Sequence, residues 1–140
     1  MRRIPTRVHG ILDYSTGALL MALPGLLKGA RRGRAEAAVP VALGVGALLY
    51  SLFTDYELGA VRKLPMKVHL ALDVASGIFF AASPWVLDLD EDVRAPYLAL
   101  GLWEIAAGLM TEPEPIRSRP AVPRAKSQLR KLARKTRRAA

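Results

Sequence analysis

The sequence predicts an all-α, polytopic membrane protein whose four transmembrane helices form two tandem, pseudo-symmetric helical hairpins. Three observations predict it. A segment of 23 residues occurs twice at an offset of 60, four long apolar stretches fill most of the chain, and the net charge of +9 lies behind the last stretch. Because 140 residues suffice for only one domain, the four stretches should form a single bundle.

The repeat is clearest in residues 5–27 and 65–87, which align without a gap and share nine identities. The second halves of the two units repeat more loosely, at an offset of 57. A repeat at a nearly fixed period is typical of a fold assembled from equivalent units. We therefore expect a four-helix transmembrane domain over residues 1–112, with repeat 1 at 5–56 and repeat 2 at 65–112.

The first hairpin is expected from residues 8–27 and 37–53. The first stretch carries His9 and Asp13 near its start and no charge after them, and the second is uncharged throughout. A helix rises about 1.5 Å per residue, so about 20 residues span the roughly 30 Å of bilayer hydrocarbon. These lengths fit one crossing each.

The second hairpin is expected from residues 68–87 and 93–110. The former repeats the histidine and aspartate near its start, and the latter is interrupted only by Arg94 and Glu104. None of the four stretches has a broad polar face opposite an apolar one, as a soluble amphipathic helix would. A water-soluble four-helix bundle is the alternative.

Charge predicts the orientation of the spans. Residues 1–112 contain 11 Lys+Arg and 11 Asp+Glu, whereas residues 113–140 contain 10 Lys+Arg and one acidic residue. With four spans, both termini and the 54–67 loop share one side, which holds 16 basic residues against five on the other. Because basic loops stay in the cytoplasm, we expect a multi-pass inner (plasma) membrane protein with both termini cytoplasmic.

The polar residues inside the expected spans fall on helix seams. Histidine and aspartate four residues apart lie on one helix face, and this face continues through glycines, which allow close helix approach. A pseudo-twofold axis along the membrane normal would bring the two copies of this face together with the fourth span. The expected buried cluster consists of His9, Asp13, His69, Asp73 and Glu104.

Two interpretations of this cluster stay open. The sequence favours a structural lock, in which hydrogen bonds and ion pairs fix the helices in a medium that offers no other polar partner. The alternative is a metal-ion or proton site for binding or transport through this cluster, with His9, Asp13, His69 and Asp73 as candidate metal ligands and Glu104 as a fifth ligand. No serine is placed by the sequence with a histidine and a carboxylate, and the chain has no cysteine. We therefore expect no enzyme activity and no cofactor.

The third stretch ends in Ser83-Pro84-Trp85, and the first offers Pro24 at the equivalent position. This motif, in the first helix of a two-helix repeat, resembles the SPW-repeat family of small bacterial integral membrane proteins. The resemblance covers residues 5–112. It implies the paired-helix topology and no particular substrate.

Residues 113–140 are expected to form a proline-spaced linker and a cytoplasmic polybasic tail. Such a tail is attracted to anionic lipid headgroups, and a protein partner or a second copy of the chain is an open alternative. Nucleic acid is disfavoured because the tail has no aromatic residue to stack on bases. The basic residues expected to contact lipid or a partner are Arg124, Lys126, Arg130, Lys131, Arg134, Lys135, Arg137 and Arg138.

Overall fold

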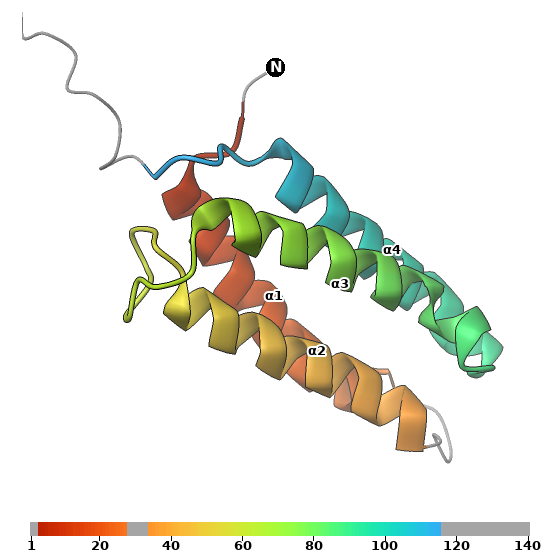
Figure 1. The fold of residues 1–140 in the computed structure, drawn as a ribbon. Helices are drawn as coiled ribbons and strands as arrows, with labels where there is room; N and C mark the ends of the chain where they lie inside the picture. Colours follow the sequence, from red (N-terminus) through yellow and green to blue (C-terminus); the bar gives the residue numbers. More distant parts are fainter. Residues whose placement is uncertain (1–2, 28–33, 116–140) are drawn as a thin grey trace, which may run out of the picture.

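The computed structural model describes residues 3–27 and 34–115, and this part of the chain is all-helical (Figure 1). Apart from two isolated backbone bridges, these residues contain no β-structure. The expected fold class is confirmed, and each helix starts two or three residues before the corresponding apolar stretch. The basic tail residues named above lie outside the described residues. The helices are α1 Thr6–Leu26, α2 Arg34–Phe53, α3 Met66–Val86 and α4 Glu91–Met110.

The helices pack as two hairpins, α1 with α2 and α3 with α4 (Figure 1). Glycines lie where the paired helices cross. A Cβ atom added to Gly44 would lie 2.6 Å from the carbonyl oxygen of Gly17, and one added to Gly101 would lie 2.5 Å from that of Gly77. Real Cβ atoms do not approach a backbone oxygen this closely. The repeat therefore preserves glycine at these four positions because the two backbones touch there.

The ends of the helices meet at one end of the bundle through short backbone pairings. Ile4, ahead of α1, pairs with Thr111 behind α4, and Leu64, ahead of α3, pairs with Thr54 behind α2. The two pairings are equivalent in the repeat. They place each threonine beside the first turns of α1 or α3.

The two hairpins contact each other more sparsely than the helices within each hairpin do. At the end away from the chain termini, an apolar cluster joins them. Its central contact is between the rings of Phe80 and Tyr97, with centroids 4.4 Å apart. The buried members of the cluster are Leu20, Leu23, Phe80, Leu89, Val93 and Tyr97. The opposite end is joined by polar side chains instead.

The outer surface of the bundle is apolar. Helices α2 and α3 are long and apolar enough to cross a membrane. Within the most apolar 18 residues of each helix, only 28% of the residues in α2 and 39% in α3 are buried. Large side chains such as Leu49, Ile78 and Leu102 are more than half exposed. A water-soluble bundle would bury these residues and expose polar ones. The arrangement disfavours the soluble alternative and fits a helical membrane protein.

Candidate metal site between the hairpins

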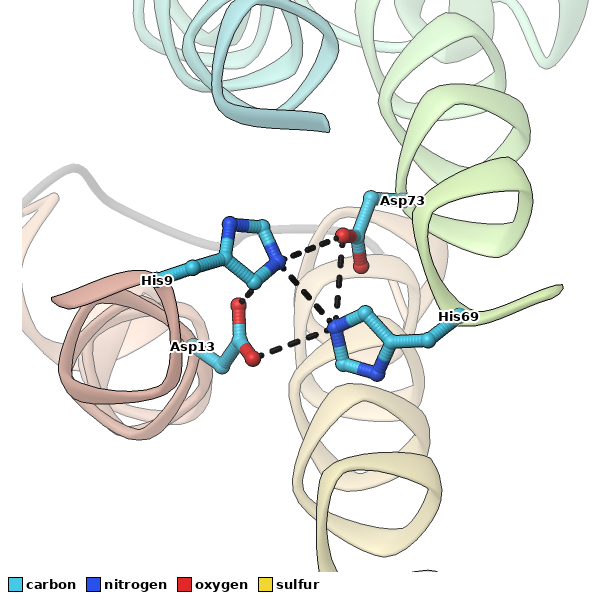
Figure 2. A group of neighbouring side chains, drawn as sticks. All are labelled: His9, Asp13, His69 and Asp73. Carbon is cyan, nitrogen blue, oxygen red and sulfur yellow. Dashed lines mark hydrogen bonds and ion pairs between the residues drawn. The ribbon is translucent and has the colours of Figure 1, made fainter. Parts of the chain in front are cut away.

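Four side chains converge at the polar end of the bundle, and we call them the tetrad: His9, Asp13, His69 and Asp73 (Figure 2). Nε2 of His9 lies 3.2 Å from Oδ1 of Asp13 and 3.0 Å from Oδ2 of Asp73. Nε2 of His69 lies 3.1 Å from Oδ2 of Asp13 and 3.3 Å from Oδ2 of Asp73. The two Nε2 atoms are themselves 3.2 Å apart. One potential ligand atom from each residue thus points toward a common centre.

Each hairpin contributes one histidine and one aspartate, from the early turns of α1 and α3. The four-residue spacing stacks each pair on one helix face, as the sequence predicts. His9, His69 and Asp73 are at most 4% exposed, and the Asp13 side chain is 9% exposed. The tetrad is therefore shielded from solvent and lies between the hairpins.

The outer nitrogen of His69 is held by a threonine. Oγ1 of Thr54 lies 2.8 Å from Nδ1 of His69 and 2.7 Å from the carbonyl oxygen of Tyr50. A carbonyl oxygen only accepts, and a hydroxyl has one hydrogen, so Thr54 donates to the carbonyl. Its oxygen must then accept a hydrogen bond from Nδ1–H of His69.

The second repeat makes the same arrangement around His9. Oγ1 of Thr111 lies 2.8 Å from Nδ1 of His9 and 2.6 Å from the carbonyl oxygen of Ala107. Each histidine is thus oriented by a threonine that follows the other hairpin's last helix. A neutral imidazole that carries its proton on Nδ1 has a lone pair on Nε2. In the neutral form of each histidine the Nε2 lone pair therefore faces the tetrad centre, and in the imidazolium form Nε2–H donates to a carboxylate there.

The four residues can each direct one ligand atom at a common metal ion, with these atoms all within 4.8 Å of one another. Zinc lies about 2.0–2.1 Å from nitrogen and about 2.0–2.2 Å from carboxylate oxygen, so tetrahedral ligand atoms are about 3.3 Å apart. The nitrogen–nitrogen distance and the nitrogen–oxygen contacts are 3.0–3.3 Å, with Asp13 using Oδ1 toward His9 and Oδ2 toward His69. A bound ion would therefore draw one oxygen of Asp13 inward to complete the tetrahedron. Metal-binding histidines almost always donate their outer N–H to a hydrogen-bond acceptor, as both histidines do here. The residues fit a bound metal ion.

Further hydroxyl groups orient the two carboxylates. Tyr50 donates to Oδ1 of Asp73 at 2.7 Å, and Tyr56 and Ser51 donate to Oδ2 of Asp13 at 3.3 and 3.4 Å. Burial raises the pKa of the Tyr56 hydroxyl well above its ordinary value, and the nearby Asp13 raises it further. Tyr56 is therefore a permanent donor to this carboxylate at physiological pH.

Sequence reasoning did not assign these hydroxyl groups to the site. For Thr54 and Thr111 a signal existed, because they occupy equivalent columns of the second halves at the 57-residue offset. For Tyr50 there was none, because the second repeat has Ala107 in its place. Only the fold shows that this tyrosine reaches Asp73.

Glu104 lies beside the tetrad. The sequence places it in the same cluster, but its Oε2 atom accepts from the hydroxyl of Ser76 at 3.4 Å, and the tetrad is formed by the other four residues. The side chain is 8% exposed and lines a small cavity that touches His9, Asp13 and Asp73. Glu104 is thus a neighbour of the site.

The Ser-Pro-Trp motif lies at the far end of α3. Ser83 is buried and donates to the carbonyl of Phe80 at 2.8 Å, and Pro84 occupies the last turn of the helix. Trp85 is 53% exposed. Pro24 occupies the corresponding turn of α1. The motif therefore shapes the helix end, and the tetrad lies at the other end of the same helix.

Long helices that turn apolar residues outward and hold buried polar residues on their inner seam define a helical membrane protein built from two-helix units. Comparison with protein families agrees: the model of the SPW repeat domain matches residues 7–111. The chain belongs to the SPW repeat family. No curated protein and no solved structure matches it.

Proposed function

We propose that the protein is a multi-pass inner-membrane protein that binds one divalent transition-metal ion in the tetrad between its hairpins. The tetrad offers two imidazole nitrogens and two carboxylates. Nitrogen ligands suit Zn²⁺ and its first-row neighbours, whereas Mg²⁺ and Ca²⁺ prefer sites made of oxygen alone. Two imidazoles and two carboxylates are a ligand set that Zn²⁺ takes in four-coordinate sites.

The convergence of the two Nε2 atoms on the carboxylate oxygens carries this proposal. Electron pairs that face each other at 3.0–3.3 Å repel unless a positive charge lies among them. The two aspartates also bring two negative charges into a buried site, where uncompensated charge is costly. One divalent cation satisfies both requirements.

The membrane arrangement is part of the same proposal. His9 and Glu104 lower the hydropathy of α1 and α4, but both are buried in the seam, so these helices also present apolar surface outward. All four helices then cross the bilayer with the termini and the basic tail in the cytoplasm, where 16 of the 21 Lys and Arg residues lie. There the tail meets anionic headgroups, each nearby basic residue contributing about 1 kcal/mol.

Metal titration of the detergent-purified protein tests the proposal. The apo protein should bind one Zn²⁺ per chain, and Asp13→Asn and Asp73→Asn should each lower the affinity strongly. Asp90→Asn is the matched control, because Asp90 is an exposed carboxylate in the turn before α4. A wild-type protein that takes up no Zn²⁺, Fe²⁺, Mn²⁺ or Co²⁺ would refute the proposal.

The second candidate function is the structural lock. The sparse contact between the hairpins favours it, because the tetrad and its hydroxyl partners supply most of the polar bonds across that interface. With protons on both Nε2 atoms, each imidazolium would donate to a carboxylate without any metal. This function predicts that Asp73→Asn lowers the unfolding temperature of the metal-free protein, with no metal bound by the wild type.

A further inference from the structure

The two repeats differ at the inner wall of the tetrad. In repeat 1 this wall carries Ala47 and Tyr50, and the equivalent positions in repeat 2, at the 57-residue offset, are Glu104 and Ala107. Tyr50 reaches across to Asp73. At the equivalent place Ala107 cannot reach Asp13, because its side chain is a single methyl group. The symmetry of the site is therefore broken on the side of Asp13.

A cavity of about 20 Å³ lies at this break. One water molecule needs roughly 10–15 Å³, so the cavity is large enough for one. Three tetrad residues line the cavity: His9, Asp13 and Asp73. All four residues at the positions where the repeats differ line it as well: Ala47, Tyr50, Glu104 and Ala107. Polar groups on its wall give a water the two to four hydrogen-bond partners that it requires.

The location of the cavity matters for a metal in the tetrad. A closed structural zinc site has four protein ligands and no room for another, whereas a reactive or exchangeable site keeps a position for water or a small ligand. Here the cavity opens directly onto ligand residues of both hairpins. Its wall also carries the Glu104 carboxylate, a buried acceptor for a hydrogen bond from a metal-bound water.

We infer that the cavity forms a fifth coordination position, which takes water or a small anion such as azide, and that Glu104 orients the bound water. This inference rests on the proposed metal site. It makes the tetrad an open centre, able to exchange its ion or to bind a small ligand.

The repeat itself supplies the test variant. Ala107→Tyr places a tyrosine where repeat 1 has Tyr50, so the cavity should be filled by a side chain for which the fold already has a counterpart. Ala75→Tyr is the control, because Ala75 is exposed on α3 and does not line the cavity. Glu104→Gln is a second variant, which keeps the shape of the side chain and removes its charge.

The probe is Co²⁺ bound to the detergent-purified protein, titrated with azide and followed by its visible absorption. We expect five-coordinate bands in the wild type that shift on azide addition. Ala107→Tyr should give more intense four-coordinate bands and weaken the azide response at least tenfold, Ala75→Tyr should match the wild type, and Glu104→Gln should bind Co²⁺ but change its azide affinity.

The outcomes separate the two claims. If the wild type binds no Co²⁺, the proposed function fails. If it binds Co²⁺ with tetrahedral bands that azide leaves unchanged, the fifth position is refuted and the metal site stands. If Ala107→Tyr does not fold, Glu104→Gln decides: an azide response identical to that of the wild type would refute the assigned role of Glu104, and an altered response would support it.

Discussion

The threonines behind α2 and α4 should control metal affinity without touching the metal. In Thr54→Val and Thr111→Val the hydroxyl that accepts from Nδ1–H is replaced by a methyl group of similar shape. In the metal-free protein the freed imidazole can move its proton to Nε2 and donate to a carboxylate. Metal binding then has to return the proton to Nδ1, where it has no partner.

The magnitude follows from that unpaired donor. Each Nδ1–Oγ1 contact is buried and 2.8 Å long, and leaving a buried donor without a partner costs about 1–3 kcal/mol. Because 1.4 kcal/mol corresponds to a factor of ten, the affinity for Zn²⁺ should fall about 5–140-fold in each variant. The pseudo-symmetry of the site predicts losses of similar size for the two.

Competition titration against a chelator of known affinity measures this loss, and ¹⁵N spectra of the imidazoles report the tautomer. In the metal-free protein, Thr54→Val should move the proton of His69 from Nδ1 to Nε2 and leave His9 unchanged. Thr111→Val should move the proton of His9 in the same way and leave His69 unchanged. Thr6→Val is the control, because Thr6 is buried in the same helix as His9 but donates to Glu57, at 2.6 Å, and not to a tetrad residue. Zn²⁺ affinities unchanged in both tetrad variants, or reduced equally in the control, would refute the reasoning.

Three further predictions concern the bundle and its membrane. Gly101→Ala places a methyl group 2.5 Å from the Gly77 carbonyl oxygen and should destabilise the protein by about 1–3 kcal/mol in detergent unfolding. Gly46→Ala meets no atom within 4 Å and should stabilise it by up to about 1 kcal/mol through helix propensity; equal effects would contradict the close crossing. Because the chain has no cysteine, Ala60→Cys and Asp90→Cys report topology: an impermeant maleimide added to intact cells should label only the thiol at position 90, and the reverse pattern would invert the orientation. Tyr50→Phe removes the 2.7 Å hydrogen bond to Asp73 and should weaken Zn²⁺ binding several-fold in calorimetry, whereas an unchanged affinity would show that this bond does not orient the ligand.

The fold could be predicted from the sequence because the relevant signals are local or repeated. The apolar stretches set the helix lengths, and the repeat fixes the number of units. The spacing of His9 and Asp13 places both on one helix face, and the recurrence of that pair at His69 and Asp73 predicts that the two faces meet. All of these inferences need only helix geometry and a twofold relation.

Other features of the site depend on contacts that no local pattern encodes. The Nδ1 proton of each histidine is held by Thr54 or Thr111, each of which reaches the site from the opposite hairpin. The position of the Glu104 side chain depends on how α4 is rotated about its axis. Its carboxylate accepts a hydrogen bond from Ser76, and the residue lines the cavity. The cavity itself exists because Ala107 is smaller than its counterpart Tyr50. These effects combine crossing geometry with side-chain volume and become visible only in the assembled bundle.

X-ray absorption at the zinc K-edge of the Zn²⁺-loaded protein tests the central claim most directly. The account predicts two imidazole nitrogens and carboxylate oxygen in the first shell, at about 2.0–2.2 Å, with one imidazole fewer in each of His9→Ala and His69→Ala. A first shell of oxygen alone, or a spectrum that both alanine variants leave unchanged, would show that the two hairpins do not meet around a metal ion.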